Sequence, residues 1–134
     1  MNVVVLGCGR VGSRLARVLD AEGHRVCVVD QNADQFKRLG SDYRGQTVLG
    51  NGIDADVLRS AGIEEADAFI AVTNGDNTNI MTAQIAKVMF NVPRVICRIY
   101  DPIREDTYHM LGLDTICPTT IIADLIHEHL TGSA

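Results

Sequence analysis

Large aromatic side chains are scarce in this sequence, which has no tryptophan, three tyrosines and three phenylalanines. Its core must therefore be built from Val, Ile, Leu and Ala, a composition that suits parallel strands covered by helices. No apolar run approaches the length of a membrane span, and the first residues lack the basic and apolar pattern of a secretion signal. We expect a cytoplasmic chain that does not insert into a membrane.

Basic residues are also in the minority. Twelve Lys and Arg stand against seventeen Asp and Glu, which gives a formal net charge of −5. Such an acidic balance argues against a general binding surface for nucleic acid or anionic lipid. Any site for phosphate must therefore be local, and we expect no nucleic-acid partner.

The sequence also lacks cysteine pairs with the C-x-x-C spacing of a metal or redox site. The cysteines are Cys8, Cys27, Cys97 and Cys117. They lie in or beside apolar runs, which favours buried free thiols over disulfides or a zinc site. Cys8 is the exception to follow, because it falls in a turn that is expected to face a ligand, and its redox role stays open.

The length of 134 residues suits one domain, and we expect residues 1–134 to form it. Short apolar runs alternate with stretches of helical spacing, which predicts an α/β fold, because parallel strands need right-handed crossover connections. The expected strands are residues 3–6, 26–29, 47–49, 68–72, 95–99 and 115–117. We predict a Rossmann-like, doubly wound parallel six-stranded sheet in the order 3-2-1-4-5-6.

A long helix is expected over residues 76–91, and it carries more apolar surface than one face against a sheet needs. The excess indicates either a subunit contact, through Ile80, Met81 and Met89, or a helix deep in the core. A final amphipathic helix is expected over residues 118–130, with a frayed end after it.

The most informative stretch is an apolar strand that runs directly into Gly7, Gly9 and Gly12, at the spacing G-x-G-x-x-G. In a phosphate-binding turn of this kind, the first glycine allows the bend, the second lets the backbone approach a pyrophosphate, and the third lets the next helix pack close. The free amides at the helix start and its positive dipole end favour an anion. Taken alone, the pattern is also compatible with an ordinary structural turn.

Asp30 makes that pattern more specific. It ends the second apolar run, about twenty residues beyond the glycines, where a dinucleotide fold places the acid that binds ribose hydroxyls. A helix capped by Asn32 is expected to follow it. Because a 2′-phosphate would meet the like charge of Asp30, NADP is disfavoured as a ligand.

The predicted strand order places a crevice between the first and fourth strands, and it brings Asn51, Thr73, Asn74 and Arg98 beside the glycine turn. Arg98 interrupts an apolar run, and a buried guanidinium needs a partner. Two alternatives stay open for Arg98: it contacts a ligand or the ligand loop, or it forms a purely structural ion pair.

Longer stretches of the sequence match a known family. These stretches are residues 5–12, 28–30, 50–63, 66–74, 95–99 and 112–118. Over nearly its whole length the chain resembles the nucleotide-binding amino-terminal domain of the RCK family, also called KTN or TrkA-N. Such domains occur in the cytoplasmic regulators of Trk and Ktr potassium uptake and in potassium-channel gating rings.

The resemblance implies a crevice that binds NAD or NADH, or else ATP or ADP. The implied site comprises Gly7, Gly9, Arg10, Val11, Gly12, Asp30, Gln31, Asn51, Gly52, Thr73, Asn74 and Arg98. Within it the glycines approach the phosphates, Arg10 reaches a phosphate in its own or a neighbouring subunit, and Asp30 holds the adenosine ribose. Asn51 stands where many members have Asp near the adenine.

Two departures from the family pattern matter. Thr119 follows Pro118 where many members carry Glu, so we predict no metal there. The chain also ends after the crossover helix that leads towards a second, carboxyl-terminal subdomain in the family. We therefore expect that subdomain to be absent, whether the chain is a natural short form or a fragment.

The leading hypothesis is a regulatory subunit or domain, not an enzyme, whose bound nucleotide biases a membrane potassium transporter between states. The resemblance implies a homodimer or a higher ring, held at the inner face of the cell membrane through the transporter. The predicted dimer interface also includes residues 108–111. The alternative is an NAD-dependent oxidoreductase or its isolated cofactor-binding domain, although the sequence has no Tyr-x-x-x-Lys pair and no evident catalytic His with a carboxylate partner.

Overall fold

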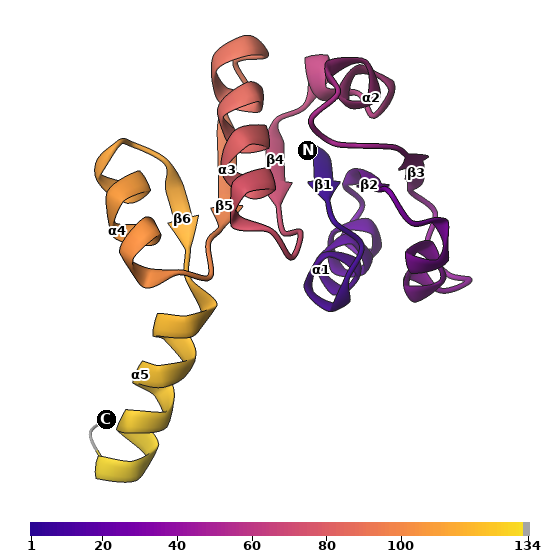
Figure 1. Cartoon of the computed structure of the whole chain (residues 1–134). Helices are drawn as coiled ribbons and strands as arrows, with labels where there is room; N and C mark the ends of the chain where they lie inside the picture. The colour runs from indigo at the N-terminus through magenta and orange to yellow at the C-terminus, as the bar shows by residue number, and fades with distance from the viewer. Residues whose placement is uncertain (133–134) are drawn as a thin grey trace.

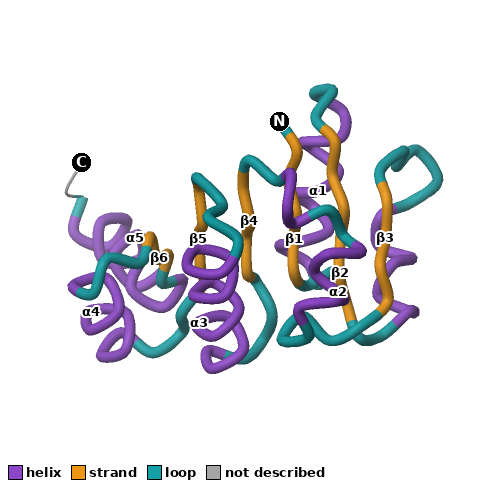
Figure 2. The backbone as a smooth tube through the Cα atoms, turned by 90° about the horizontal axis from the view of Figure 1, so that it is seen from above, coloured by secondary structure: helices purple, strands orange, loops and turns teal. Residues whose placement is uncertain are grey.

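The computed structural model describes residues 1–132, and its centre is a single sheet of six parallel strands. The strand order is β3-β2-β1-β4-β5-β6 (Figures 1 and 2), which confirms the predicted topology. The strands are β1 (Asn2–Leu6), β2 (Arg25–Asp30), β3 (Gln46–Leu49), β4 (Ala68–Ala71), β5 (Arg94–Arg98) and β6 (Asp114–Ile116).

Helices cover both faces of this sheet (Figure 2). The α-helices are α1 (Arg10–Ala21), α2 (Ala55–Ser60), α3 (Asp76–Gln84), α4 (Pro102–Met110) and α5 (Pro118–Thr131). Two 3₁₀-helices, η1 (Ala33–Leu39) and η2 (Ile63–Glu65), and one π-helix, η3 (Ile85–Met89), complete the set within the described residues. Helices α1 and η1 pack on one face, and α2, α3, η3 and α4 pack on the other.

The central strand β1 explains why both faces need cover. Val3 and Val5 join the cluster under α1, whereas Val4 and Leu6 join the cluster under α2. All four side chains are at most 3% exposed, as alternation along a parallel strand between two helical layers requires. This burial fixes the carboxyl end of β1, and so the glycine turn that follows it.

The segment after Asn32 differs from the expected α-helix. Asn32 does cap it, since its side chain accepts a hydrogen bond of 3.0 Å from the Asp34 amide, but the turns are 3₁₀. Phe36 and Leu39, three residues apart, both pack against the cluster under α1. A helix with three residues per turn places both on one side, which accounts for the tighter winding.

The expected long helix over residues 76–91 divides at Gln84 into α3 and the π-helix η3. Ile80 is 6% exposed and packs with Ala83 and Cys97, so its expected place in a subunit contact is wrong. Met81 and Met89 remain about half exposed, at 49% and 58%. One side of this segment therefore lies in the core, and a subunit contact through Met81 and Met89 stays a prediction.

Helix α5 leaves the body of the domain and points away from the sheet (Figure 1). None of its residues is buried. The helix continues through Thr131, so the fraying expected after residue 130 is wrong at that position, and residues 133 and 134 lie outside the described part. Within residues 1–132, no helix combines the length and apolar character needed to cross a bilayer.

Candidate functional site

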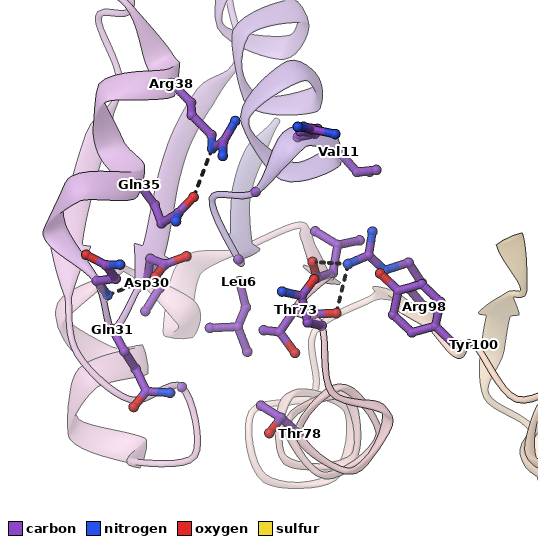
Figure 3. A pocket seen from close by; sticks show the side chains of 18 residues that line it. Leu6, Val11, Asp30, Gln31, Gln35, Arg38, Thr73, Thr78, Arg98 and Tyr100 are labelled. Carbon is purple, nitrogen blue, oxygen red and sulfur yellow. Dashed lines mark hydrogen bonds between the residues drawn. The ribbon is translucent and has the colours of Figure 1, made fainter.

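A crevice opens at the carboxyl ends of β2, β1, β4 and β5, where the strand order reverses between β1 and β4 (Figure 3). Its volume is about 570 Å³, within the range of small-molecule sites. The predicted residues that line it are Gly7, Gly9, Arg10, Val11, Asp30, Gln31, Gly52, Thr73, Asn74 and Arg98. A second cavity of about 540 Å³, at the amino ends of the strands, contains none of them. Doubly wound sheets bind ligands at the carboxyl ends, so the first crevice is the candidate site.

The three glycines of the turn have three different surroundings. Gly7 has φ of +107°, and a Cβ there would lie 2.8 Å from the Val72 carbonyl oxygen, so the bend requires glycine. A Cβ on Gly12 would lie 1.8 Å from the Gly7 carbonyl oxygen, which shows how closely α1 packs on the turn. A Cβ on Gly9 would meet no atom within 4 Å. Gly9 therefore leaves open space, and Gly12 lies beneath the turn instead of lining the crevice.

The start of α1 provides the positive end of the site. Gly9 is its N-cap residue and offers no side chain to the free amides, and the first turn contains no acidic residue. The first amides of a helix have no acceptor within the helix, and the dipole adds partial positive charge there. In a chain of net charge −5, this local arrangement is suited to a phosphate.

Asp30 is held rigidly on the opposite side of the turn. Its Oδ2 accepts a hydrogen bond of 2.8 Å from the Cys8 amide, and its Oδ1 accepts one of 2.9 Å from the Asn32 amide. Each carboxylate oxygen has a second lone pair, so it can still accept a hydrogen bond from a ligand hydroxyl. Asp30 thus joins the glycine turn to the start of η1, a structural role that the sequence did not reveal.

The side chain of Cys8 does not face the crevice, contrary to expectation. It is fully buried among the residues under α1, and its Sγ donates to the Gln35 carbonyl oxygen at 3.3 Å. Burial, and secondly the charge of Asp30, raise the pKa of this thiol to about 11. A protonated, enclosed thiol is a poor nucleophile. The other three cysteines are also buried and free, as predicted.

Asn79, which was not among the predicted site residues, holds the loop after β4. Its buried Oδ1 accepts hydrogen bonds from the Thr73 amide at 2.9 Å and the Thr73 hydroxyl at 2.7 Å. Its Nδ2 donates to the carbonyl oxygens of Thr73 and Arg98, each at 3.0 Å. One side chain therefore joins the ends of β4 and β5. Its only signal in the sequence is a polar residue at a core position of a helix.

Arg98 supports the same loop from the other side. Its Nη2 donates to the carbonyl oxygens of Val72 and Thr73, both at 2.8 Å (Figure 3), and its guanidinium lies 4.7 Å from the centre of the Tyr100 ring. The ion pairs found within residues 1–132 are Lys37–Asp34 and Arg59–Asp56, so Arg98 has no carboxylate partner there. The purely structural ion pair is therefore wrong: Arg98 instead holds the loop after β4, and its contact with a ligand stays a prediction.

Eight of the lining residues were not predicted, and two of them carry polar side chains on η1. Gln35 and Arg38 lie on η1 above Asp30 (Figure 3), where Arg38 Nε donates to Gln35 Oε1 at 2.9 Å. Their spacing of three residues places both on one side of the 3₁₀-helix. Asn51, in contrast, does not line the crevice; its Oδ1 accepts a hydrogen bond from the Ile53 amide at 3.1 Å in a local turn.

Residues 1–132 contain no group of three or more His, Cys, Asp or Glu side chains placed to hold a metal ion. At Thr119, where the sequence predicts no metal, the side-chain hydroxyl donates a hydrogen bond to the Tyr100 carbonyl oxygen at 2.7 Å. This contact joins the start of α5 to the end of β5, next to the ring that lies against Arg98.

Comparison with known families places this geometry in context. The sequence profile of the TrkA-N domain matches residues 3–119. The chain belongs to the TrkA-N domain family. Among the TrkA-N relatives, the Trk system potassium uptake protein TrkA of Streptomyces coelicolor is 49% identical over 133 residues, which is 99% of this chain and 60% of that protein. This TrkA-N chain therefore spans less than two thirds of the relative.

Solved structures show the same TrkA-N fold. The Kef carboxyl-terminal domain of Shewanella denitrificans, in an AMP-bound form, has a TM-score of 0.82 at 22% identity, covering 98% of this chain and 80% of that one. The GsuK channel bound to NAD has a TM-score of 0.73 at 24% identity, covering 90% of this chain and 22% of that one. At these identities the likeness is one of fold.

Proposed function

We propose that this TrkA-N domain binds an adenosine nucleotide in the crevice and acts as the regulatory, non-enzymatic sensor of a potassium uptake system. The observation that carries the proposal is the uncapped start of α1 at Gly9, which lies on the opposite side of the glycine turn from the fixed carboxylate of Asp30. The first group suits phosphate and the second suits ribose hydroxyls. The Streptomyces relative is named as a potassium uptake protein, which supports the wider role.

Twelve of the lining residues have a place in this proposal. The backbone at Gly7, Gly9 and Val11 faces the phosphates, and Arg10 adds a positive side chain. The adenosine end lies against a second group of residues, namely Asp30, Gln31, Gln35, Arg38 and Gly52, and the far end against Thr73, Asn74 and Arg98. The ligand is NAD or NADH, or ATP or ADP, and the charge of Asp30 disfavours NADP.

A self-associated state is part of the proposal. Five aliphatic side chains of α5 are exposed, namely Ile121 (47%), Ile122 (55%), Leu125 (50%), Ile126 (55%) and Leu130 (81%). A helix of 14 residues is marginally stable in water without packing, so this apolar stripe needs a partner surface. We assign it to a second copy in a homodimer or larger ring. The exposed Met81, Met89, Met110 and Leu111 add further apolar surface to the proposed assembly.

The proposed cellular setting follows from that assembly. Within the assembly this chain supplies a cytoplasmic nucleotide-binding domain, and its partner is a membrane potassium transporter subunit. A nucleotide biases the transporter only if it binds two arrangements of the assembled domains with different affinity. The domain therefore lies at the inner face of the membrane through its partner.

A ligand panel tests the nucleotide site. Thermal unfolding and calorimetry with NAD, NADH, ADP, ATP and NADPH, in one buffer, should show stabilisation by an adenosine nucleotide and least by NADPH. A ligand at 100 times its Kd adds about 2.7 kcal/mol to the free energy of unfolding. Binding to none of the five, or NADPH as the tightest ligand, contradicts the proposal. Sustained NADH oxidation with a panel of small carbonyl compounds would support the oxidoreductase alternative instead.

Sedimentation equilibrium tests the assembly. The Leu125→Asp variant should dissociate at lower concentration than the wild-type protein, because a carboxylate then lies in the apolar stripe. Asp124→Asn, on the neighbouring exposed position, is the matched control and should associate like wild type. A wild-type protein that stays monomeric at high concentration would refute the dimer.

A further inference from the structure

Arg98 carries a positive charge that the described protein does not neutralise. The residue is 9% exposed, and Nη2 is its only nitrogen with a hydrogen-bond acceptor within residues 1–132. Its Nε is buried without a partner, the one such side-chain atom found in that part of the chain. Burying an unpaired charge is costly, and neutral carbonyl oxygens offset that cost only in part. The residue lines the crevice, and its Nη1, which is not buried and has no acceptor within residues 1–132, can meet an anionic ligand group there.

The position of the guanidinium defines which part of a ligand it meets. Arg98 is the last residue of β5, but its side chain crosses to the end of β4, where it holds the Val72 carbonyl oxygen. That same oxygen would lie 2.8 Å from a Cβ on Gly7. The guanidinium is therefore about one strand spacing, roughly 4.8 Å, from the glycine turn, on the side away from Asp30.

A nucleotide in this crevice has a fixed direction. Asp30, on β2, takes the ribose end, and the first phosphate lies over the start of α1, beyond β1. The chain of phosphates then continues towards β4, where the guanidinium lies. Ribose and guanidinium are separated by about two strand spacings, roughly 10 Å, a distance of the order of that between the ribose and the second or third phosphate of a nucleotide.

We propose that Arg98 is a specificity-determining residue that recognises the terminal phosphate of a nucleoside diphosphate or triphosphate. This inference rests on the proposed nucleotide site, and it names the part of the ligand that determines specificity. The Tyr100 ring, 4.7 Å from the guanidinium, holds its plane in position, and Asn79 fixes the Arg98 backbone through its carbonyl oxygen. AMP has no phosphate at this point, whereas ADP and ATP have one. Occupation of the guanidinium by phosphate would act directly on the loop at Thr73.

Calorimetry with AMP and ADP tests the assignment in wild type, Arg98→Gln and Arg98→Lys. Wild type should bind ADP more tightly than AMP. Arg98→Gln keeps an amide donor for the loop but removes the charge, so its affinity for ADP should fall about 10- to 100-fold while that for AMP changes less than about threefold. Arg98→Lys keeps the charge and should retain most of the preference for ADP.

Three results overturn the inference. Equal losses for AMP and ADP in Arg98→Gln mean that Arg98 acts only by holding the loop. An unchanged affinity for ADP means that the charge does not contact the ligand. If Arg98→Lys loses the preference for ADP as Arg98→Gln does, the positive charge at this position is not what recognises the terminal phosphate.

The same experiments distinguish a failure of this inference from a failure of the proposed nucleotide site. If Arg98→Gln fails to fold, Arg98→Met fills the same buried space without charge, and the same ratio of affinities is measured. Asp30→Asn should weaken AMP and ADP together. A wild type that binds neither nucleotide contradicts the proposed site, whereas a wild type that binds both with a ratio independent of Arg98 contradicts the present inference alone.

Discussion

The two glycines at the start of α1 provide a matched pair of substitutions with opposite expected effects. In Gly12→Ala, the new methyl group would lie 1.8 Å from the Gly7 carbonyl oxygen, 2.9 Å from the Gly7 carbonyl carbon and 3.3 Å from Val72 Cγ2. Two of these atoms are backbone and cannot turn aside. In Gly9→Ala, the methyl group meets nothing within 4 Å, and φ of −78° is allowed for alanine.

The magnitudes follow from these distances. An ordinary contact starts near 3.4 Å, so Gly12→Ala must move the start of α1 by about 1.6 Å or distort the turn. Overpacking of this kind costs about 1–3 kcal/mol, and the better helix propensity of alanine recovers about 0.5–1 kcal/mol. We expect a net loss of about 1 kcal/mol for Gly12→Ala. For Gly9→Ala, reduced chain entropy and a slightly poorer cap nearly cancel, within about 0.5 kcal/mol.

Urea denaturation measures the stability of the two variants, and calorimetry measures their affinity for nucleotide. Gly9→Ala should unfold at the wild-type urea midpoint but lose at least about tenfold in nucleotide affinity, since its methyl group occupies the approach to the amides. Gly12→Ala should unfold at a lower midpoint. If Gly9→Ala binds nucleotide like wild type, phosphate does not approach at Gly9. If Gly12→Ala is as stable as wild type, the close packing of α1 on the turn is not what the third glycine provides.

Two further predictions concern stability. Asn79→Ala should lower the free energy of unfolding by about 2–4 kcal/mol in urea denaturation, because it removes the acceptor of the Thr73 amide and the amide donor to the Arg98 carbonyl oxygen. Asn77→Ala, on the exposed side of α3, should change it by less than about 0.5 kcal/mol. Stability should also fall as the pH rises from about 9 to about 11, because burial raises the pKa of Cys8 and Cys27 from 9.0 to about 11, so the unfolded chain loses these protons first. A Cys27→Ala variant should show a weaker fall over the same range, and a slope identical to wild type would contradict the assignment.

The fold was predictable because its signals are local and repeated. Apolar strands, glycine stops and helical spacing alternate along the whole chain, and right-handed crossovers leave few topologies for that pattern. The predicted strand order is the observed one. The details that differ, the 3₁₀ winding of η1 and the π-helical end at η3, depend on how a few side chains fit the sheet beneath them, which periodicity does not record.

The site was predictable only in part, for a similar reason. Most of the residues named from the motif line one crevice, since the carboxyl ends of parallel strands meet at one edge. The direction of individual side chains was not predictable: Cys8 points into the core, Asn51 bonds within its own turn, and Ile80 is buried. Each of these outcomes depends on which neighbours lie within reach in three dimensions.

The sequence by itself determined the topology, the position of the glycine turn and the acid that faces it, because each is written in short-range spacing. Only the tertiary structure decided that Asn79 clamps the loop after β4 and that Arg98 crosses from one strand end to the next without a carboxylate partner among the described residues. The contacts of Asn79 with the loop span 6 positions, whereas those that join β5 to α3 and to the end of β4 span 19 to 26. Their pairing is set by the order of strands in the sheet and by the cost of leaving a buried polar group alone.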